Sequence, residues 1–176
     1  MILILLILVF RSYFQMIIIF LMIPMGLVGA FAAHILRGEP ISFLSLLGLC
    51  ALMGVIINDS IVYIDTINRN LAKGMLLYKS IYEAGLSRFR PIVLTTLSTG
   101  VGMAPLIFEK SLQAKFLIPM ALALSGGLFL GSIFILYMVP ALFLIINRVK
   151  YFWNYLWGYR GSPEGLEVAV LEKDLT

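Results

Sequence analysis

Four long apolar segments, and part of a fifth, constrain this sequence more than any other feature. A helix needs about 20 mostly apolar residues to cross the hydrocarbon of a bilayer, and the four segments are about that long. Hydrophobic residues make up 61% of the chain and charged residues 12%, against roughly 45–50% and roughly 25% in a soluble domain. A water-soluble core cannot enclose so much apolar surface, so we predict an all-α membrane protein.

The expected architecture is a helical bundle of four full transmembrane helices, a truncated first one and an interfacial connecting helix. Charge, glycine and proline together mark a turn at residues 37–40. Pro91 is expected to open a span, because proline fits the first turn of a helix. The expected segments are a truncated transmembrane helix at 1–10, transmembrane helices at 16–36, 41–71 (with a cytoplasmic extension), 91–108 and 116–146, an interfacial connector at 74–90, and a cytoplasmic tail at 147–176.

The basic residues are scattered over the polar connections, which argues against a nucleic-acid-binding patch. If the spans alternate in direction, ten basic residues lie on one side of the membrane and three on the other. The positive-inside rule then places the ten, and the C-terminus, in the cytoplasm. The ten are Arg11, Arg69, Lys73, Lys79, Arg88, Arg90, Arg148, Lys150, Arg160 and Lys173, and the three are Arg37, Lys110 and Lys115.

Asn58, Asp59 and Ser60 interrupt an otherwise apolar span. An ionisable group inside a membrane helix is a functional candidate, because its carboxylate must find a partner, reach water or take a proton. Asp59 could instead be a shallow interfacial residue or a structural hydrogen-bonding group. Asn58 shares a helical stripe with Ala51 and Gly54, whose small size predicts a contact with another helix.

The next span is rich in hydroxyl groups, from Thr95 to Thr99. One helical stripe, extended backwards, would hold Arg88, Thr95 and Gly102. These hydroxyls could line a hydrated path together with Asn58 and Asp59. Equally, they could hydrogen-bond only to carbonyl groups of their own helix.

Several other features predict packing rather than chemistry. Small residues spaced four apart, such as Gly127 and Gly131, favour close contact between helices. The single Cys50 excludes a disulfide within the chain and is expected to be a buried packing residue. We find no metal-ligand cluster, no nucleophile with a base and no phosphate-binding loop, so an enzyme is not expected.

A specific order of motifs runs through the chain: the turn at residues 10–12, the stretch at 24–26, GVIINDSIVYID at 54–65, Asn68 and Arg69, Glu83 and Ala84, RFRPIVLTT at 88–96, Gly126 and Gly127, and VPAL at 139–142. In this order they resemble the resistance-nodulation-division (RND) efflux pumps. The likeness is to the last five transmembrane helices of these pumps, the eighth to the twelfth, and it covers residues 1 to about 150. The tail lies outside it.

The resemblance implies a set of proton-relay candidates. Many members combine two aspartates on the fourth helix with a lysine, a threonine and an arginine on later helices. Asn58 takes the position of the lysine, Asp59 that of its neighbour, Thr95 that of the threonine and Arg88 that of the arginine. Asn58 departs from the best-known drug pumps, which have a lysine at this position. Asparagine can hydrogen-bond a carboxylate but cannot carry a positive charge between two aspartates.

The resemblance further implies a bacterial inner-membrane antiporter that exchanges protons for drugs or other amphiphilic solutes, as in multidrug resistance. Protons are the expected coupling ion, and no cofactor is expected. It implies a homotrimer with a periplasmic adaptor, an outer-membrane channel and an N-terminal part of the same pump beyond this chain. A metal exporter is less expected, because a methionine relay has no clear counterpart here. The alternatives are a non-transporting anchor or accessory subunit, and a relative that moves lipids or metal ions.

Overall fold

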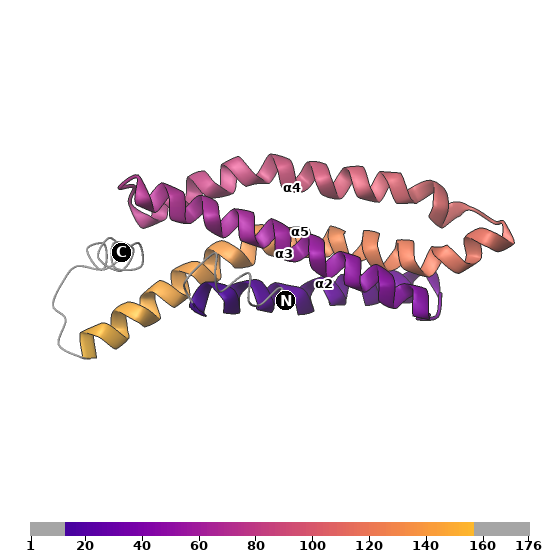
Figure 1. Cartoon of the computed structure of the whole chain (residues 1–176), viewed down its shortest axis with the longest axis horizontal. Helices are drawn as coiled ribbons and strands as arrows, with labels where there is room; N and C mark the ends of the chain where they lie inside the picture. Colours follow the sequence, from indigo (N-terminus) through magenta and orange to yellow (C-terminus); the bar gives the residue numbers. More distant parts are fainter. Residues whose placement is uncertain (1–12, 157–176) are drawn as a thin grey trace.

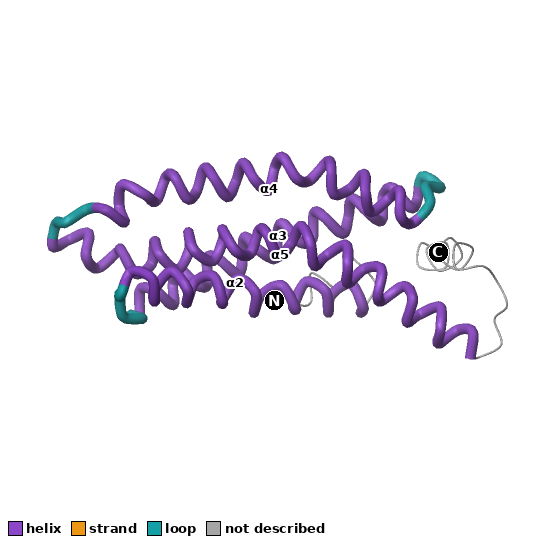
Figure 2. Tube along the Cα trace, turned by 180° about the vertical axis from the view of Figure 1, so that it is seen from behind, coloured by secondary structure: helices purple, strands orange, loops and turns teal. Residues whose placement is uncertain are grey.

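The structure, a computed structural model, describes residues 13–156 as four long helices with no strand in that range (Figure 1). Helix α2 covers Tyr13–Arg37, α3 covers Phe43–Ala72, α4 covers Leu77–Phe108 and α5 covers Leu112–Leu156. All four are long and apolar enough to cross a membrane. They run alongside one another and are joined by short connections (Figure 2). The predicted all-α membrane bundle is therefore confirmed, while the helix expected at 1–10 and most of the expected tail lie outside the described residues.

The observed helix bounds differ from the expected ones chiefly in α4 and α5. The expected connector at 74–90 and the span at 91–108 form one helix, so that Pro91 lies inside α4 instead of opening a helix. Proline removes one backbone donor, and a membrane helix can continue past it where nearby groups satisfy the freed carbonyl. Helix α5 continues to Leu156, so the first ten residues expected in the tail are helical.

Local sequence signals set the ends of α2 and α3. Gly38 and Gly74 have φ angles of 70° and 78°, a left-handed backbone that glycine adopts without strain, and each follows the end of a helix. Helix α3 begins with a capping box, in which the Ser42 side chain accepts from the Ser45 backbone N–H and the Ser45 side chain accepts from the Ser42 backbone N–H. These signals place the turns of the bundle where the apolar segments stop.

Glycines allow α5 to pack closely against α2 and α3. A Cβ atom added to Gly29 of α2 would lie 2.6 Å from the backbone oxygen of Gly126 in α5. Gly127 and Gly131 lie against the side chains of Leu52 and Ile56 of α3. Helix α5 therefore forms the centre of the bundle, and its small residues let two neighbouring helices approach its backbone.

Helix α4 is the least enclosed of the four. In its most apolar window only 11% of the residues are buried, compared with 44% in α3. Its buried residues, Ser80, Ile81, Ala84, Ile92 and Thr96, all lie before residue 97. Cys50 of α3 is also exposed, contrary to the expected buried thiol. Much of the apolar surface of α4 is therefore free to meet lipid or other protein.

A buried histidine joins α2 to the start of α3. The His34 side chain is 4% exposed, and its Nδ1 lies 2.9 Å from the Ala30 carbonyl oxygen. Because a carbonyl oxygen only accepts, Nδ1 is the protonated nitrogen, and Nε2 contacts the Ser45 hydroxyl at 2.9 Å. Ser45, the second member of the α3 capping box, thus also holds the end of α2.

Replacing His34 with alanine is expected to lower the free energy of unfolding of the chain in detergent by about 2 kcal/mol, because two buried hydrogen bonds are lost. The measurement is an SDS titration in mixed micelles followed by circular dichroism. Ile35→Ala is the control, since the neighbouring side chain is 79% exposed. Equal effects of the two substitutions would contradict a bridging role for His34.

Candidate functional site

The three polar residues in the middle of α3 face three environments. Asn58 is exposed, Asp59 is half-buried and Ser60 is fully buried, and no hydrogen-bond partner is present for the Ser60 hydroxyl among the described residues. This divergence follows from the 100° turn between successive helical residues. Asp59 therefore lies at the boundary between the packed side of α3 and its open side.

The expected contact between the Asn58 stripe and another helix is not made within residues 13–156. Gly54 has no atom within 4 Å of an added Cβ, and Ala51 is exposed, as Asn58 is. The reason is that α3 buries a different stripe, which contains Leu52, Ile56, Tyr63 and Ile67. The small residues beside Asn58 thus form an open surface that another helix could approach closely.

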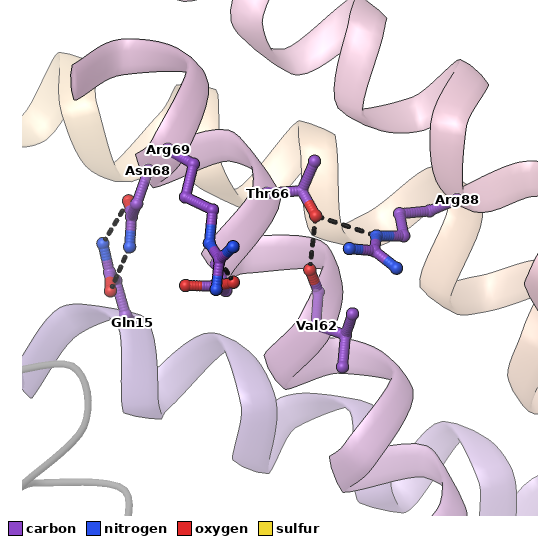
Figure 3. Close-up of polar contacts among 7 residues, drawn as sticks. Gln15, Val62, Thr66, Asn68, Arg69 and Arg88 are labelled. Carbon is purple, nitrogen blue, oxygen red and sulfur yellow. Dashed lines mark hydrogen bonds and ion pairs between the residues drawn. The ribbon is translucent and has the colours of Figure 1, made fainter. Parts of the chain in front are cut away.

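Arg88 of α4 contacts α3 directly. Its Nε donates a hydrogen bond of 2.8 Å to the Thr66 hydroxyl, and the Thr66 hydroxyl donates one of 2.7 Å to the Val62 carbonyl oxygen. In Figure 3 the side chains of Arg88 and Thr66 point toward each other. Sequence reasoning singled out Arg88 but missed Thr66, which lies seven residues beyond Asp59 in α3.

The hydroxyl groups of α4 bond mainly to their own helix. Thr95 is exposed and donates to the Ile92 carbonyl oxygen at 2.9 Å. Thr96 is buried, donates to the same oxygen at 2.9 Å, and meets the Ser132 hydroxyl of α5. Thr95 therefore follows the alternative expectation, in which the hydroxyl hydrogen-bonds only to a carbonyl group of its own helix. Thr96 adds a polar contact between α4 and α5.

The four relay candidates do not form one connected cluster. Among residues 15–149, no hydrogen bond or ion pair joins Asn58 or Asp59 to Arg88 or Thr95. The carboxyl groups on the described surface also form no metal site, because no three His, Cys, Asp or Glu side chains come together there. The structure thus places Asn58 and Thr95 on the open sides of α3 and α4, and among the described residues the one bond that a candidate makes between these helices joins Arg88 to Thr66.

Two further polar contacts, missed by sequence reasoning, lie beyond Asp59 on α3 (Figure 3). Gln15 of α2 and Asn68 of α3 exchange hydrogen bonds of 2.9 and 3.1 Å between their side-chain amides. Asp65 forms an ion pair of 2.8 Å with Arg69, whose side chain is 75% exposed. Such an exposed pair four residues apart contributes little to stability, whereas the amide pair fixes α2 against α3.

These features define a multi-pass membrane protein with polar groups inside its spans. The AcrB/AcrD/AcrF family model matches residues 1–147. The chain also resembles the crystal structure of a heavy metal efflux pump, with a TM-score of 0.70 and 26% sequence identity over 81% of this chain. It covers 15% of that pump's chain. The chain therefore belongs to the AcrB/AcrD/AcrF family, which confirms the resemblance to RND efflux pumps.

Proposed function

We propose that this chain is the C-terminal transmembrane portion of a proton-driven exporter, and that protons are its coupling ion. The observation that carries the proposal is the half-buried Asp59 near the middle of a membrane-spanning helix. A carboxyl group at that depth must be paired, hydrated or protonated, and among the described residues it has no ion-pair partner. A group that exchanges its proton there can couple proton entry to the movement of helices.

The remaining candidates take complementary roles in this proposal. Arg88 supplies a permanent positive charge beside α3, because a guanidinium does not lose its proton in proteins. Asn58, on the open side of α3, can donate to and accept from a carboxyl group on a neighbouring helix. Thr95 can offer its hydroxyl oxygen as a further acceptor on the open side of α4.

The open side of α3 supports a contact with helices outside this chain. Ala51, Gly54 and Asn58 leave room for a second backbone, and this chain covers only 15% of the similar heavy metal efflux pump. We place the chain in the bacterial inner membrane with a cytoplasmic C-terminus, as part of a homotrimer. A periplasmic adaptor and an outer-membrane channel are the further partners.

Drugs or other amphiphilic solutes are the proposed cargo, and metal ions are the second candidate. The second candidate is favoured by one comparison, since one of the similar solved structures is that of a heavy metal efflux pump. Export assays with a dye and with a metal ion, on the same reconstituted pump, separate the two. Export of the metal ion without export of the dye would make metal ions the cargo and would contradict the proposal of amphiphilic solutes.

Replacing Asp59 with asparagine in the complete pump is expected to reduce export driven by a pH gradient about tenfold, equivalent to about 1.4 kcal/mol in the barrier. Asparagine keeps the shape of the side chain but cannot take up a proton. The measurement is export from proteoliposomes at several external pH values. Asp65→Asn is the matched control, because Asp65 is paired with the exposed Arg69. Unchanged export and unchanged pH dependence in Asp59→Asn would reject the role of Asp59.

A further inference from the structure

A single hydroxyl group sets how the Arg88 side chain is held against α3. Thr66 is half-buried, and its Oγ1 contacts both the Val62 carbonyl oxygen at 2.7 Å and the Arg88 Nε at 2.8 Å. The carbonyl can only accept, so the hydroxyl proton points to Val62. The lone pairs of Oγ1 are then available to Nε–H, and the direction of both hydrogen bonds is fixed.

This arrangement orients the guanidinium group as well as binding it. The threonine side chain has two substituents on Cβ, which restricts its rotation, and the bond to the Val62 carbonyl oxygen holds Oγ1 in one place on α3. A guanidinium group is planar, so a fixed Nε–H bond limits the directions in which the two Nη groups point. Among residues 15–149 the Nη groups have no hydrogen-bond partner. They therefore stay available for another group while Nε is held.

We infer that Thr66 is a positioning residue for Arg88, which holds the guanidinium in a fixed orientation between α3 and α4. The inference rests on the proposed role of Arg88 in proton coupling. Thr66 does not itself exchange a proton in this scheme, because its hydroxyl is committed to the Val62 carbonyl oxygen. Its contribution is to keep the charge of Arg88 at a constant place relative to α3 when helices move.

The first test measures the hydrogen bond itself in the 176-residue chain in lipid nanodiscs. Thr66→Val removes the hydroxyl and keeps the branched shape, whereas Thr66→Ser keeps the hydroxyl. The Arg88 Nε–H signal in a nitrogen-15 NMR spectrum, assigned by its loss in Arg88→Gln, reports the bond. Exchange of this hydrogen with water is expected to be about tenfold faster in Thr66→Val and nearly unchanged in Thr66→Ser. Equal exchange rates in the unsubstituted chain, in Thr66→Val and in Thr66→Ser would overturn the inference.

The second test measures export by the complete pump in proteoliposomes. Thr66→Val is expected to lower export about tenfold, and Thr66→Ser is expected to restore most of it. In the Arg88→Gln background, Thr66→Val is expected to have no further effect, because the group that it positions is gone. Equal loss in the valine and serine variants would indicate a packing role and overturn the inference.

The proposed role of Arg88 in proton coupling and the positioning role of Thr66 would be contradicted by different results. If Arg88→Gln leaves export unchanged, the proposed role of Arg88 in coupling is wrong, whatever the NMR signal shows. If Arg88→Gln abolishes export but Thr66→Val does not lower it, only the positioning role is wrong. The amount of each variant in the membrane, measured by immunoblot, is used to normalise every rate.

Discussion

Replacing Gly29 with valine is expected to separate α2 from α5 and to lower the free energy of unfolding of the chain by roughly 3 kcal/mol. The cause is direct contact between backbones. A Cβ at Gly29 would lie 2.6 Å from the Gly126 oxygen and 3.1 Å from the Gly127 Cα atom. Backbone atoms cannot rotate away as a flexible side chain can, so the whole of one helix must move.

Gly54→Val is the matched control for this prediction, because it adds the same side chain to a helix of the same bundle. Nothing lies within 4 Å of a Cβ at Gly54, so the expected change is below about 1 kcal/mol, the range of helix propensities. Both variants are compared by SDS titration of the chain in mixed micelles. A similar loss of stability in the two would show that the α2–α5 contact is not as close as described.

Replacing Arg88 with glutamine is expected to reduce proton-driven export by the complete pump about a hundredfold, or about 2.7 kcal/mol in the barrier. Glutamine can still hydrogen-bond to Thr66 but carries no charge, so the test separates charge from contact. Export is measured in proteoliposomes with an imposed pH gradient.

Arg69→Gln serves as the control for the charge of Arg88. Arg69 is also a basic residue and belongs to α3, but its side chain is 75% exposed and is paired with Asp65. Loss of such an exposed ion pair is expected to change export by less than about threefold. Equal loss of export in Arg69→Gln and Arg88→Gln would indicate a general effect of net charge and contradict a specific role for Arg88.

The positions of the helices could be predicted from the sequence because long apolar segments have few ways to satisfy their backbone groups in lipid. Pro91 was misleading, since proline is compatible both with the start of a helix and with the interior of a membrane helix. Its preference for the first turn favours a helix start at Pro91, whereas in the structure α4 runs through Pro91 from Leu77. The helix bounds therefore needed the three-dimensional context.

The candidate site was less predictable, because helical periodicity shows which residues share a stripe but not what each stripe faces. Asn58 and Gly54 do share a stripe, yet that stripe packs against no helix among the described residues. The partners of Arg88 and Gln15 are 22 and 53 residues away in the chain. No local pattern connects residues so far apart, and Thr66 in particular resembles many other threonines in membrane helices.

Helix α5 is long enough to extend well beyond the hydrocarbon of the bilayer. Its 45 residues form a helix of about 68 Å, more than twice the roughly 30 Å of hydrocarbon. Its final turns diverge from α3 and α4 (Figure 1). A tilt of only about 10° around the glycine contacts near the middle of α5 would move its far end by roughly 6 Å. A slight rocking of the bundle inside the bilayer would thus produce a larger displacement outside it.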